Sequence, residues 1–131
     1  MNKLIKEIIT LCPSFEEEWE KYLKSWFQDE EDGDPTSFDV FTSFSRHVCD
    51  QLINNKNESW EKIFEWAEKL QDSEYDNDIC VNFLENIMNR IPKKISVEVA
   101  KKNFFPYLGP KSKYFCQEWD KFTGFKTDGL Y

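Results

Sequence analysis

The only histidine of the chain, His47, limits the chemistry that the sequence can support. Cys49 follows two residues later, and side chains two residues apart do not face each other on a helix, so a Cys–His pair within this segment is excluded. A pair formed across the fold is left open, and its partners are the distant cysteines Cys12, Cys80 and Cys116. Because no motif supplies a third group to orient such a pair, we interpret His47 as a surface or boundary residue of a helix. The sequence therefore predicts no enzyme.

The spacing of the four cysteines indicates neither a disulfide framework nor a metal site. Cys12, Cys49, Cys80 and Cys116 are each more than thirty residues apart, and no C-x-x-C pair is present. A disulfide framework is typical of small secreted proteins with closely spaced cysteines. We therefore expect small, buried or half-buried hydrophobic residues in a cytosolic protein, and no metal or other cofactor.

The acidic loop of residues 28–34 is a poor match to a calcium-binding loop. If Gly33 took the sixth position of an EF-hand loop, Gln28 would stand first and Asp39 last, where such loops carry Asp and a bidentate Glu. Pro35 would take the eighth position, and it has no N–H. We expect a solvated acidic loop instead.

Phosphate-binding glycine motifs and the G-x-S-x-G motif are also missing, which further argues against an enzyme.

Negative charge is concentrated near the beginning of the chain. Residues 14–39 hold ten acidic residues and two lysines, a net of -8, which equals the net charge of the whole chain. Residues 50–89 hold ten acids and three lysines, whereas residues 90–113 hold seven bases and one acid. A mostly acidic surface repels nucleic acid and favours a basic protein partner. For the basic stretch, we favour pairing with the protein's own acidic face over a binding role.

We expect the binding surface within the acidic region, on a helix and the loop after it. The carboxylates would steer the encounter, and exposed aromatic side chains would supply most of the affinity. The candidate binding residues are Glu16, Glu17, Glu20, Trp26, Phe27, Glu30, Glu31 and Asp32.

The elements that must position these residues are helices, because apolar residues recur at helical spacing along most of the chain. The segments are 3–11, 15–27, 35–52, 60–70, 79–88, 93–102 and 110–122. Ser14 reads as the N-cap of the second segment, with Glu17 completing a capping box, and Asp34 reads as the N-cap of the third. We predict an all-α fold of about six to seven helices over a single domain, residues 1–131.

Two arrangements of these helices are consistent with the pattern: an antiparallel helical stack, or HEAT-like helix pairs. The tripeptide Trp19-Glu20-Lys21 recurs as Trp60-Glu61-Lys62, and this offset of 41 residues falls in the HEAT range. In the last helix we expect Phe115, Trp119 and Phe122 to face the core, with Trp119 among the most buried residues. Apolar runs are too short for a membrane span, so no membrane association is expected.

The end of the sequence carries a motif. The run Leu108-Gly109-Pro110-Lys111-Ser112, followed by Cys116, Trp119-Asp120 and Phe122-Thr123-Gly124, resembles the closing motif of a family of small, acidic, all-helical bacterial proteins of unknown function. Residues 81–86 are similar to a second signature of that family. The resemblance implies a helical fold and no activity. Physically, Gly109 and Pro110 start a helix and Gly124 ends it.

We therefore predict a non-enzymatic, cytosolic protein-binding module, and more specifically an immunity-type inhibitor of a basic toxin. The alternative is a small HEAT-like scaffold or regulatory domain that binds a peptide in a concave groove. The first prediction rests on acidity, size and helicity, which are general features that immunity proteins share.

Overall fold

The computed structural model describes residues 2–131, and over this range it is helical without strands. The α-helices are α1 (Asn2–Leu11), α2 (Phe15–Trp26), α3 (Ser37–Ile53), α4 (Trp60–Leu70), α5 (Glu85–Met88), α6 (Val97–Asn103) and α7 (Pro110–Phe122). Two short 3₁₀ turns, η1 (Glu30–Asp32) and η3 (Phe105–Tyr107), and a π-helical segment, η2 (Asp78–Leu84), complete the elements. Segment η2 continues directly into α5. The prediction of an all-α fold with six to seven helices is confirmed.

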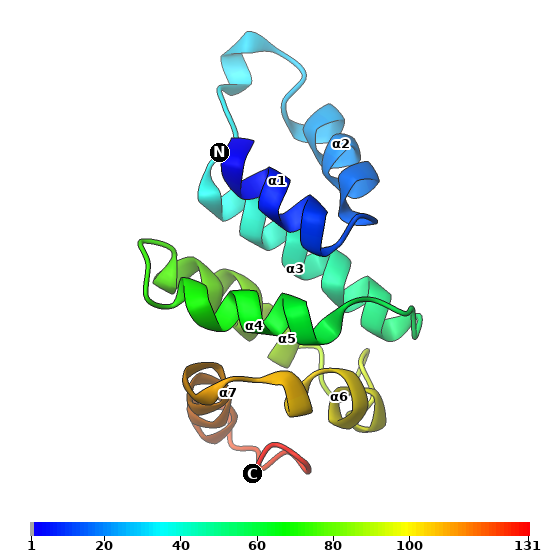
Figure 1. Cartoon of the computed structure of the whole chain (residues 1–131), viewed down its shortest axis with the longest axis vertical. Helices are drawn as coiled ribbons and strands as arrows, with labels where there is room; N and C mark the ends of the chain where they lie inside the picture. Colours follow the sequence, from blue (N-terminus) through cyan, green and yellow to red (C-terminus); the bar gives the residue numbers. More distant parts are fainter. Residues whose placement is uncertain (1) are drawn as a thin grey trace.

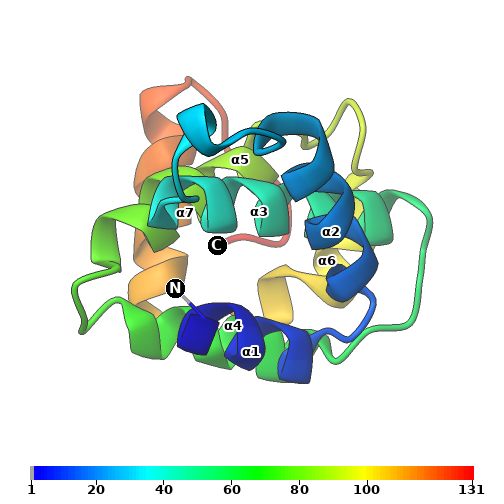
Figure 2. The same ribbon diagram turned by 90° about the horizontal axis from the view of Figure 1, so that it is seen from above.

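The helices form layers that follow the order of the chain along the longest axis of the molecule (Figure 1). Helices α1 and α2 lie at one end, α4 and α5 in the middle, and α6 and α7 at the other end. Helix α3 crosses the molecule obliquely, from the level of α1 to that of α4 (Figure 1), and packs against α2, η2, α5 and α6. Seen from above, α1 lies over α4 (Figure 2). Helix α3 is thus the element that connects the layers.

A series of phenylalanine rings holds the layers together. Phe15, at the start of α2, lies 5.1 Å from Phe44 of α3, and Phe44 lies 5.5 Å from Phe83 of η2. Phe83 contacts Phe64 of α4 at 6.2 Å, and Phe64 contacts Phe104 at 5.0 Å. All five side chains are fully buried. Each ring pair contributes about 0.5–1.5 kcal/mol beyond the burial of its area.

The start of α3 differs from the prediction. The N-cap is Thr36, not Asp34, and Thr36 forms a capping box with Asp39. The Asp39 carboxylate accepts hydrogen bonds from the Thr36 N–H at 2.8 Å and from the Tyr22 hydroxyl at 2.7 Å. Because Tyr22 belongs to α2, the same carboxylate that caps α3 also joins it to α2.

The C-terminal motif builds a joint between α4 and α7. The Glu68 carboxylate, on α4, accepts hydrogen bonds from the backbone N–H groups of Lys111 at 3.0 Å and Ser112 at 2.8 Å. These are donors that the first turn of a helix cannot satisfy internally. The Ser112 hydroxyl in turn accepts from the Gln71 amide at 2.7 Å. The motif therefore serves the fold, as expected, although Glu68, which lies outside it, completes the joint.

The second half of the motif anchors the residues after α7. Buried Asp120 accepts hydrogen bonds from the Thr127 N–H and hydroxyl, both at 2.6 Å, and from the Tyr131 hydroxyl at 3.1 Å. The predicted inward face of α7 is partly wrong. Trp119 is only half-buried, and Phe122 is 81% exposed, because the side of α7 that faces the core presents Ser112, Cys116 and Asp120.

The recurring Trp-Glu-Lys tripeptide does not mark equivalent positions. Trp60 is the first residue of α4, whereas Trp19 lies in the second turn of α2. Both tryptophans are buried, so the recurrence reflects two separate packing positions.

Across residues 2–131, each helix is too short or too polar to cross a membrane.

Candidate functional site

Ser14 does not cap α2, although its position in the sequence predicted that role. It stands at the N-cap position of α2, but its side chain makes no capping hydrogen bond, and its backbone is already helical. The predicted capping box with Glu17 is therefore wrong. The Ser14 hydroxyl instead lies 2.8 Å from Nε2 of His47 on α3 and 2.6 Å from Oε2 of Glu58, in the loop before α4. A helix cap contributes about 1 kcal/mol, so this diversion needs a structural or functional reason.

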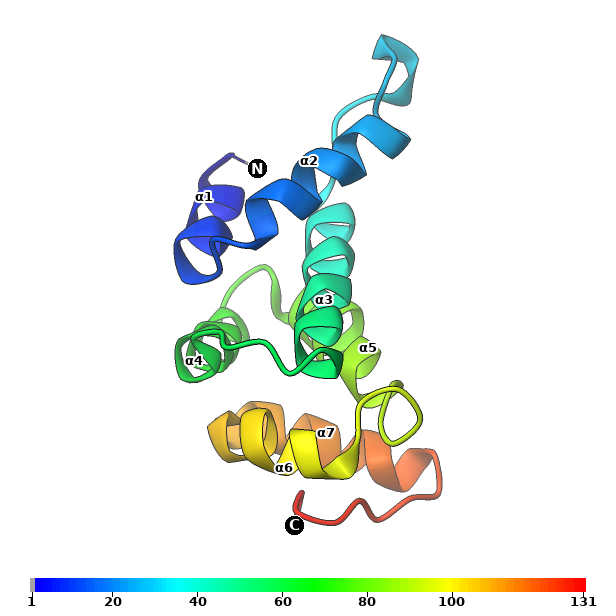
Figure 3. The same cartoon turned by 90° about the vertical axis from the view of Figure 1, so that its right-hand side faces the viewer.

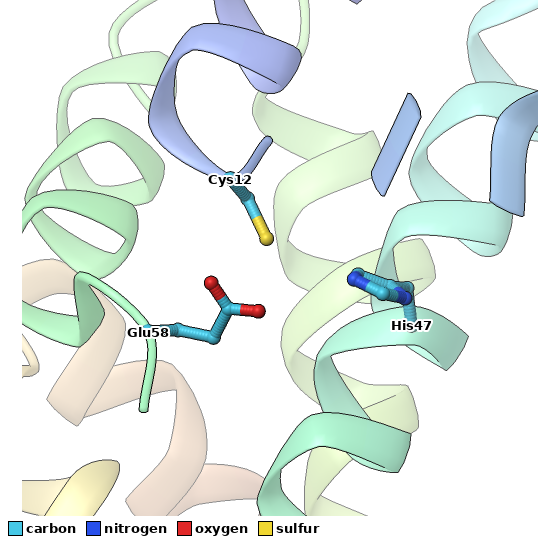
Figure 4. Close-up of side chains that lie close together, drawn as sticks. All are labelled: Cys12, His47 and Glu58. Atoms are coloured by element: carbon cyan, nitrogen blue, oxygen red, sulfur yellow. The ribbon is translucent and has the colours of Figure 1, made fainter. Parts of the chain in front are cut away.

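Three potential metal ligands surround the Ser14 hydroxyl. The thiol of Cys12, the His47 imidazole and the Glu58 carboxylate have ligand atoms that all lie within 4.8 Å of one another. They come from three segments and point toward a common centre (Figure 4). Cys12 and His47 are buried, Glu58 is half-buried, and Ser14 reaches the solvent. We call these four residues the Ser14 cluster.

The hydrogen bonds of the Ser14 cluster have a defined direction. The single hydroxyl proton of Ser14 is donated to the Glu58 carboxylate, which is an acceptor only. Nε2 of His47 must then carry its proton and donate to Ser14. In a nucleophile–base pair the hydroxyl would donate to the imidazole. The arrangement is therefore a polar network, in which His47 does not act as a base toward Ser14.

Burial shifts the pKa values of two members of the Ser14 cluster, Cys12 and His47. Burial, together with the nearby Glu58, raises the pKa of Cys12 to about 11, so the thiol is protonated at neutral pH and is a weak nucleophile. Burial also lowers the pKa of His47, although Glu18, Glu58 and Asp50 act in the opposite direction. The imidazole is therefore neutral at neutral pH, which is the form that binds metal ions.

The other three cysteines lie outside the Ser14 cluster. Cys49 and Cys116 are buried and Cys80 is half-buried, and all four thiols are free, as predicted. Burial raises the pKa of Cys49 to about 12, that of Cys80 to about 11 and that of Cys116 further still.

The Ser14 cluster was not predicted from the sequence, because its members come from segments that are far apart in the chain. One signal was present: His47 follows Val40 by seven residues and Phe44 by three, and both are buried, so His47 lies on the inward face of α3. His47 is only 6% exposed, and its interpretation as a surface or boundary residue is wrong. Of the three distant cysteines, Cys12 is the one whose thiol lies near His47, and the Ser14 hydroxyl contacts both side chains.

The predicted acidic surface is exposed, but its residues do not share one side. Glu16, Glu17, Glu20, Glu30, Glu31 and Asp32 are all exposed. Glu17 precedes Trp26 by nine residues, two and a half turns, so the two side chains lie on opposite sides of α2. Glu17 also pairs with Lys21 at 3.5 Å. Asp32 caps the η1 turn by accepting from the Gln28 and Asp29 N–H groups.

The loop after α2 projects from the end of the molecule (Figure 3). Six acidic residues and no basic residue lie between Lys24 and Arg46, and within residues 2–131 none of these six forms an ion pair. Two exposed aromatic side chains flank this loop: Trp26, 65% exposed, and Phe38, 55% exposed. Phe38 follows the helical spacing of the buried residues of α3, but it lies in the first turn of that helix and faces solvent. Phe27, a predicted anchor, is half-buried against Tyr22 at 6.1 Å.

A rigid support lies beneath Trp26. Its ring contacts Tyr22 at 6.5 Å, Tyr22 stacks on Trp19 at 5.5 Å, and the Tyr22 hydroxyl is fixed by Asp39. Burial, together with the hydrogen bond to Asp39, raises the pKa of Tyr22 to about 12. Trp26 and Tyr22 also line a groove of about 170 Å³ between α2 and α3, which reaches His47.

Part of the basic stretch pairs with the protein's own acids, as favoured above. Lys111 forms an ion pair with Asp72, and Lys101 pairs with Asp128 at 3.0 Å and with Glu98 at 3.9 Å. Both lysine pKa values are raised by these hydrogen bonds. These pairs are exposed and contribute little to stability.

The fold and sites define an all-helical protein with an acidic, aromatic-flanked loop at one end and a partly buried polar cluster, the Ser14 cluster. Residues 5–125 match the family described as a domain of unknown function, DUF7674. The chain belongs to this family, which confirms the predicted membership of a helical family without an assigned function. Comparison with curated proteins and with solved structures gave no match.

Proposed function

We propose that this chain is a non-enzymatic protein-binding module that uses α2 and the loop of residues 27–36 to bind a basic protein. One observation carries the proposal: two exposed aromatic side chains, Trp26 and Phe38, flank a projecting loop that holds only acidic charges. We call this region the acidic surface.

The carboxylates and the aromatic side chains of the acidic surface have different roles in binding. Unpaired carboxylates on a projecting loop attract a basic partner over about 8 Å at physiological ionic strength and accelerate its association. Aromatic side chains supply affinity once they are covered, and Trp is among the residues most enriched at binding hot spots. Because Tyr22, which is itself stacked on Trp19, already contacts one side of Trp26, binding orders fewer side-chain rotamers there.

The specific form of this proposal is a cytosolic, immunity-type inhibitor that blocks a basic toxin. Its four free thiols suit a reducing compartment. In this form, the gene for the partner is a secreted toxin gene beside the gene for this chain. A neighbouring gene of that kind supports the inhibitor, and its absence favours a different basic partner.

Capture from host lysate with matched variants tests the proposal. The test variant is Trp26→Ala/Phe38→Ala, and the control is Tyr114→Ala/Phe122→Ala, which removes two exposed aromatic side chains from α7 at the other end of the molecule. We expect a basic protein to be captured by the wild type and the control and lost with the test variant. Poly-lysine serves as the reference for binding by charge alone, which the test variant should retain. Equal capture by both variants would contradict the proposal.

The alternative, a scaffold that binds a peptide, is favoured by a second observation. A surface groove of about 600 Å³ lies between α1 and α4, and it is lined by Lys3, Lys6, Glu7, Thr10, Leu11 and Trp66. The same capture experiment separates the two functions. Thr10→Arg changes an exposed residue of this groove. If capture is lost with Thr10→Arg and kept with Trp26→Ala/Phe38→Ala, the scaffold is the better function.

A further inference from the structure

We propose that Cys12, His47 and Glu58 form a binding site for a zinc ion. The site is separate from the acidic surface, and its test needs no protein partner. The sequence predicted no metal, because the three ligands come from the residue after α1, the middle of α3 and the loop before α4.

The donor set has the chemistry of zinc. One sulfur, one imidazole nitrogen and one carboxylate oxygen are the three ligand types that Zn²⁺ takes in proteins, at about 2.0–2.3 Å. Calcium and magnesium prefer all-oxygen sites, so they fit poorly here. The thiolate and the carboxylate together carry two negative charges, which balance a divalent ion. Binding exchanges the thiol proton of Cys12, which leaves to solvent, for the metal–sulfur bond. It also requires the proton of neutral His47 to move from Nε2 to Nδ1, so that Nε2 can bind the ion.

The Ser14 hydroxyl marks the position of the ion. Oγ lies 3.4 Å from Sγ of Cys12, 2.8 Å from Nε2 of His47 and 2.6 Å from Oε2 of Glu58. One small polar atom therefore touches all three donors, as a bound ion would. Each distance exceeds a zinc bond by about 0.5–1 Å, so the donors must close inward. Ser14 is exposed, and its hydroxyl must turn aside for the ion to enter, which leaves the fourth position to water.

A neighbouring residue already orients the carboxylate. The Gln51 amide donates to Oε2 of Glu58 at 2.6 Å. Because Gln51 follows His47 by four residues, both side chains leave the same face of α3. When the Ser14 hydroxyl turns aside, Oε2 of Glu58 keeps the hydrogen bond from Gln51 and has a free lone pair for the ion. Such outer partners typically change metal affinity about 10- to 100-fold.

Zinc at this site would connect three segments that otherwise meet through a few hydrogen bonds. It would hold the α1–α2 junction and the α3–α4 loop against α3. An ion that binds only the folded state raises the melting temperature in proportion to the logarithm of its concentration. A bound zinc ion would thus stabilise the packing of the N-terminal layer of the fold.

The test starts with the wild-type chain, stripped of metal by a chelator and titrated with Co²⁺ and with Zn²⁺. Cobalt is a spectroscopic substitute for zinc, and a thiolate ligand gives it a charge-transfer band in the near-ultraviolet. We expect this band to saturate at one equivalent, to disappear when Zn²⁺ is added, and to be accompanied by a rise in melting temperature. Wild-type protein without a thiolate band would overturn the proposal, whatever the variants do.

Variants then assign the ligands. Cys12→Ser should abolish the thiolate band and weaken zinc binding by more than about 100-fold, which exceeds the loss of an outer partner. His47→Gln and Glu58→Gln should weaken it similarly. Cys80→Ser is the matched control, since Cys80 is a half-buried thiol outside the cluster. It should keep both the band and the affinity of the wild type.

Ser14→Ala covers the case in which a ligand variant fails to fold. It keeps all three ligands and removes the hydroxyl that occupies the centre, so it should bind zinc at least as tightly as the wild type. A folded Cys12→Ser protein with wild-type affinity, or a band that Cys80→Ser removes, would show that the ion binds elsewhere and refute the site.

Discussion

Gly109 and Glu68 lie so close that a Cβ atom on Gly109 would come within 2.5 Å of Cδ of Glu68. The same carboxylate accepts the backbone N–H groups of Lys111 and Ser112. Only glycine leaves the carboxylate room to reach the start of α7, where its negative charge also complements the helix dipole. The glycine of the C-terminal motif is therefore explained by a residue of α4.

We expect Gly109→Ala and Glu68→Ala each to lower the free energy of unfolding by about 1–2 kcal/mol, as the loss of a helix cap does. An alanine at position 109 displaces the carboxylate that Glu68→Ala removes, so the double variant should cost clearly less than the sum. Urea unfolding of the two single variants and the double variant measures this coupling. Glu61→Ala, on the exposed side of α4, is the control and should change little. Additive losses would show that the glycine and the carboxylate act independently.

A second prediction concerns buried Asp120, which holds Thr127 and Tyr131. Asp120→Asn keeps the size of the side chain but turns one acceptor into a donor that faces other donors. We expect a loss of about 1.5–3 kcal/mol, the range for hydrogen bonds to charged groups. Chemical denaturation provides the value, and hydrogen exchange should show faster exchange at the Thr127 amide. Glu118→Gln, an exposed change on the same helix, should stay within about 0.5 kcal/mol of the wild type; equal effects of the two changes would exclude the anchoring role.

The Tyr22–Asp39 hydrogen bond should make stability depend on pH at both extremes. Burial alone would raise the pKa of Asp39, but the Thr36 N–H and Tyr22 hydroxyl bonds outweigh it and hold the pKa below its ordinary value of 3.8. A carboxyl group with a lowered pKa in the folded state stabilises the fold above its unfolded pKa, and this contribution is lost as pH falls through the folded value. Tyr22 behaves in the opposite sense. Its pKa is raised from 10.0 to about 12, so its contribution is present below pH 10 and is lost as pH rises toward 12.

Asp39→Asn should flatten the acid side of the stability–pH profile. The variant should reduce, but not abolish, the loss of stability at alkaline pH, because burial is the larger cause of the raised Tyr22 pKa. Unfolding by urea over a pH series compares this variant with the wild type. Asp34→Asn is the control, since Asp34 is exposed in the same loop. If the Asp39→Asn profile parallels that of the wild type in acid, the carboxylate does not contribute to the pH dependence.

Helical periodicity predicted the number and approximate bounds of the helices well, because each apolar stripe had to face a core. Which side chains of each helix face the core was harder to predict. Phe38 and Phe122 follow helical spacing but lie near helix ends, where no neighbour covers them. The Ser14 cluster could not be predicted, because its ligands come together only when α1, α3 and the loop before α4 pack. Ser14 was assigned the role that its local sequence favours, and tertiary contacts with His47 and Glu58 override it.

The central claim is that the acidic surface attracts a basic protein, and the association rate constant tests it most directly. Glu30→Lys/Glu31→Lys reverses two unpaired charges of the projecting loop, and Glu61→Lys/Glu74→Lys makes the same change in net charge at exposed positions on α4 and the following loop. With the captured basic partner, we predict that the first variant associates at least about tenfold more slowly than the second, and that rising salt removes the difference. Equal association rates for the two variants at low salt would contradict the claim.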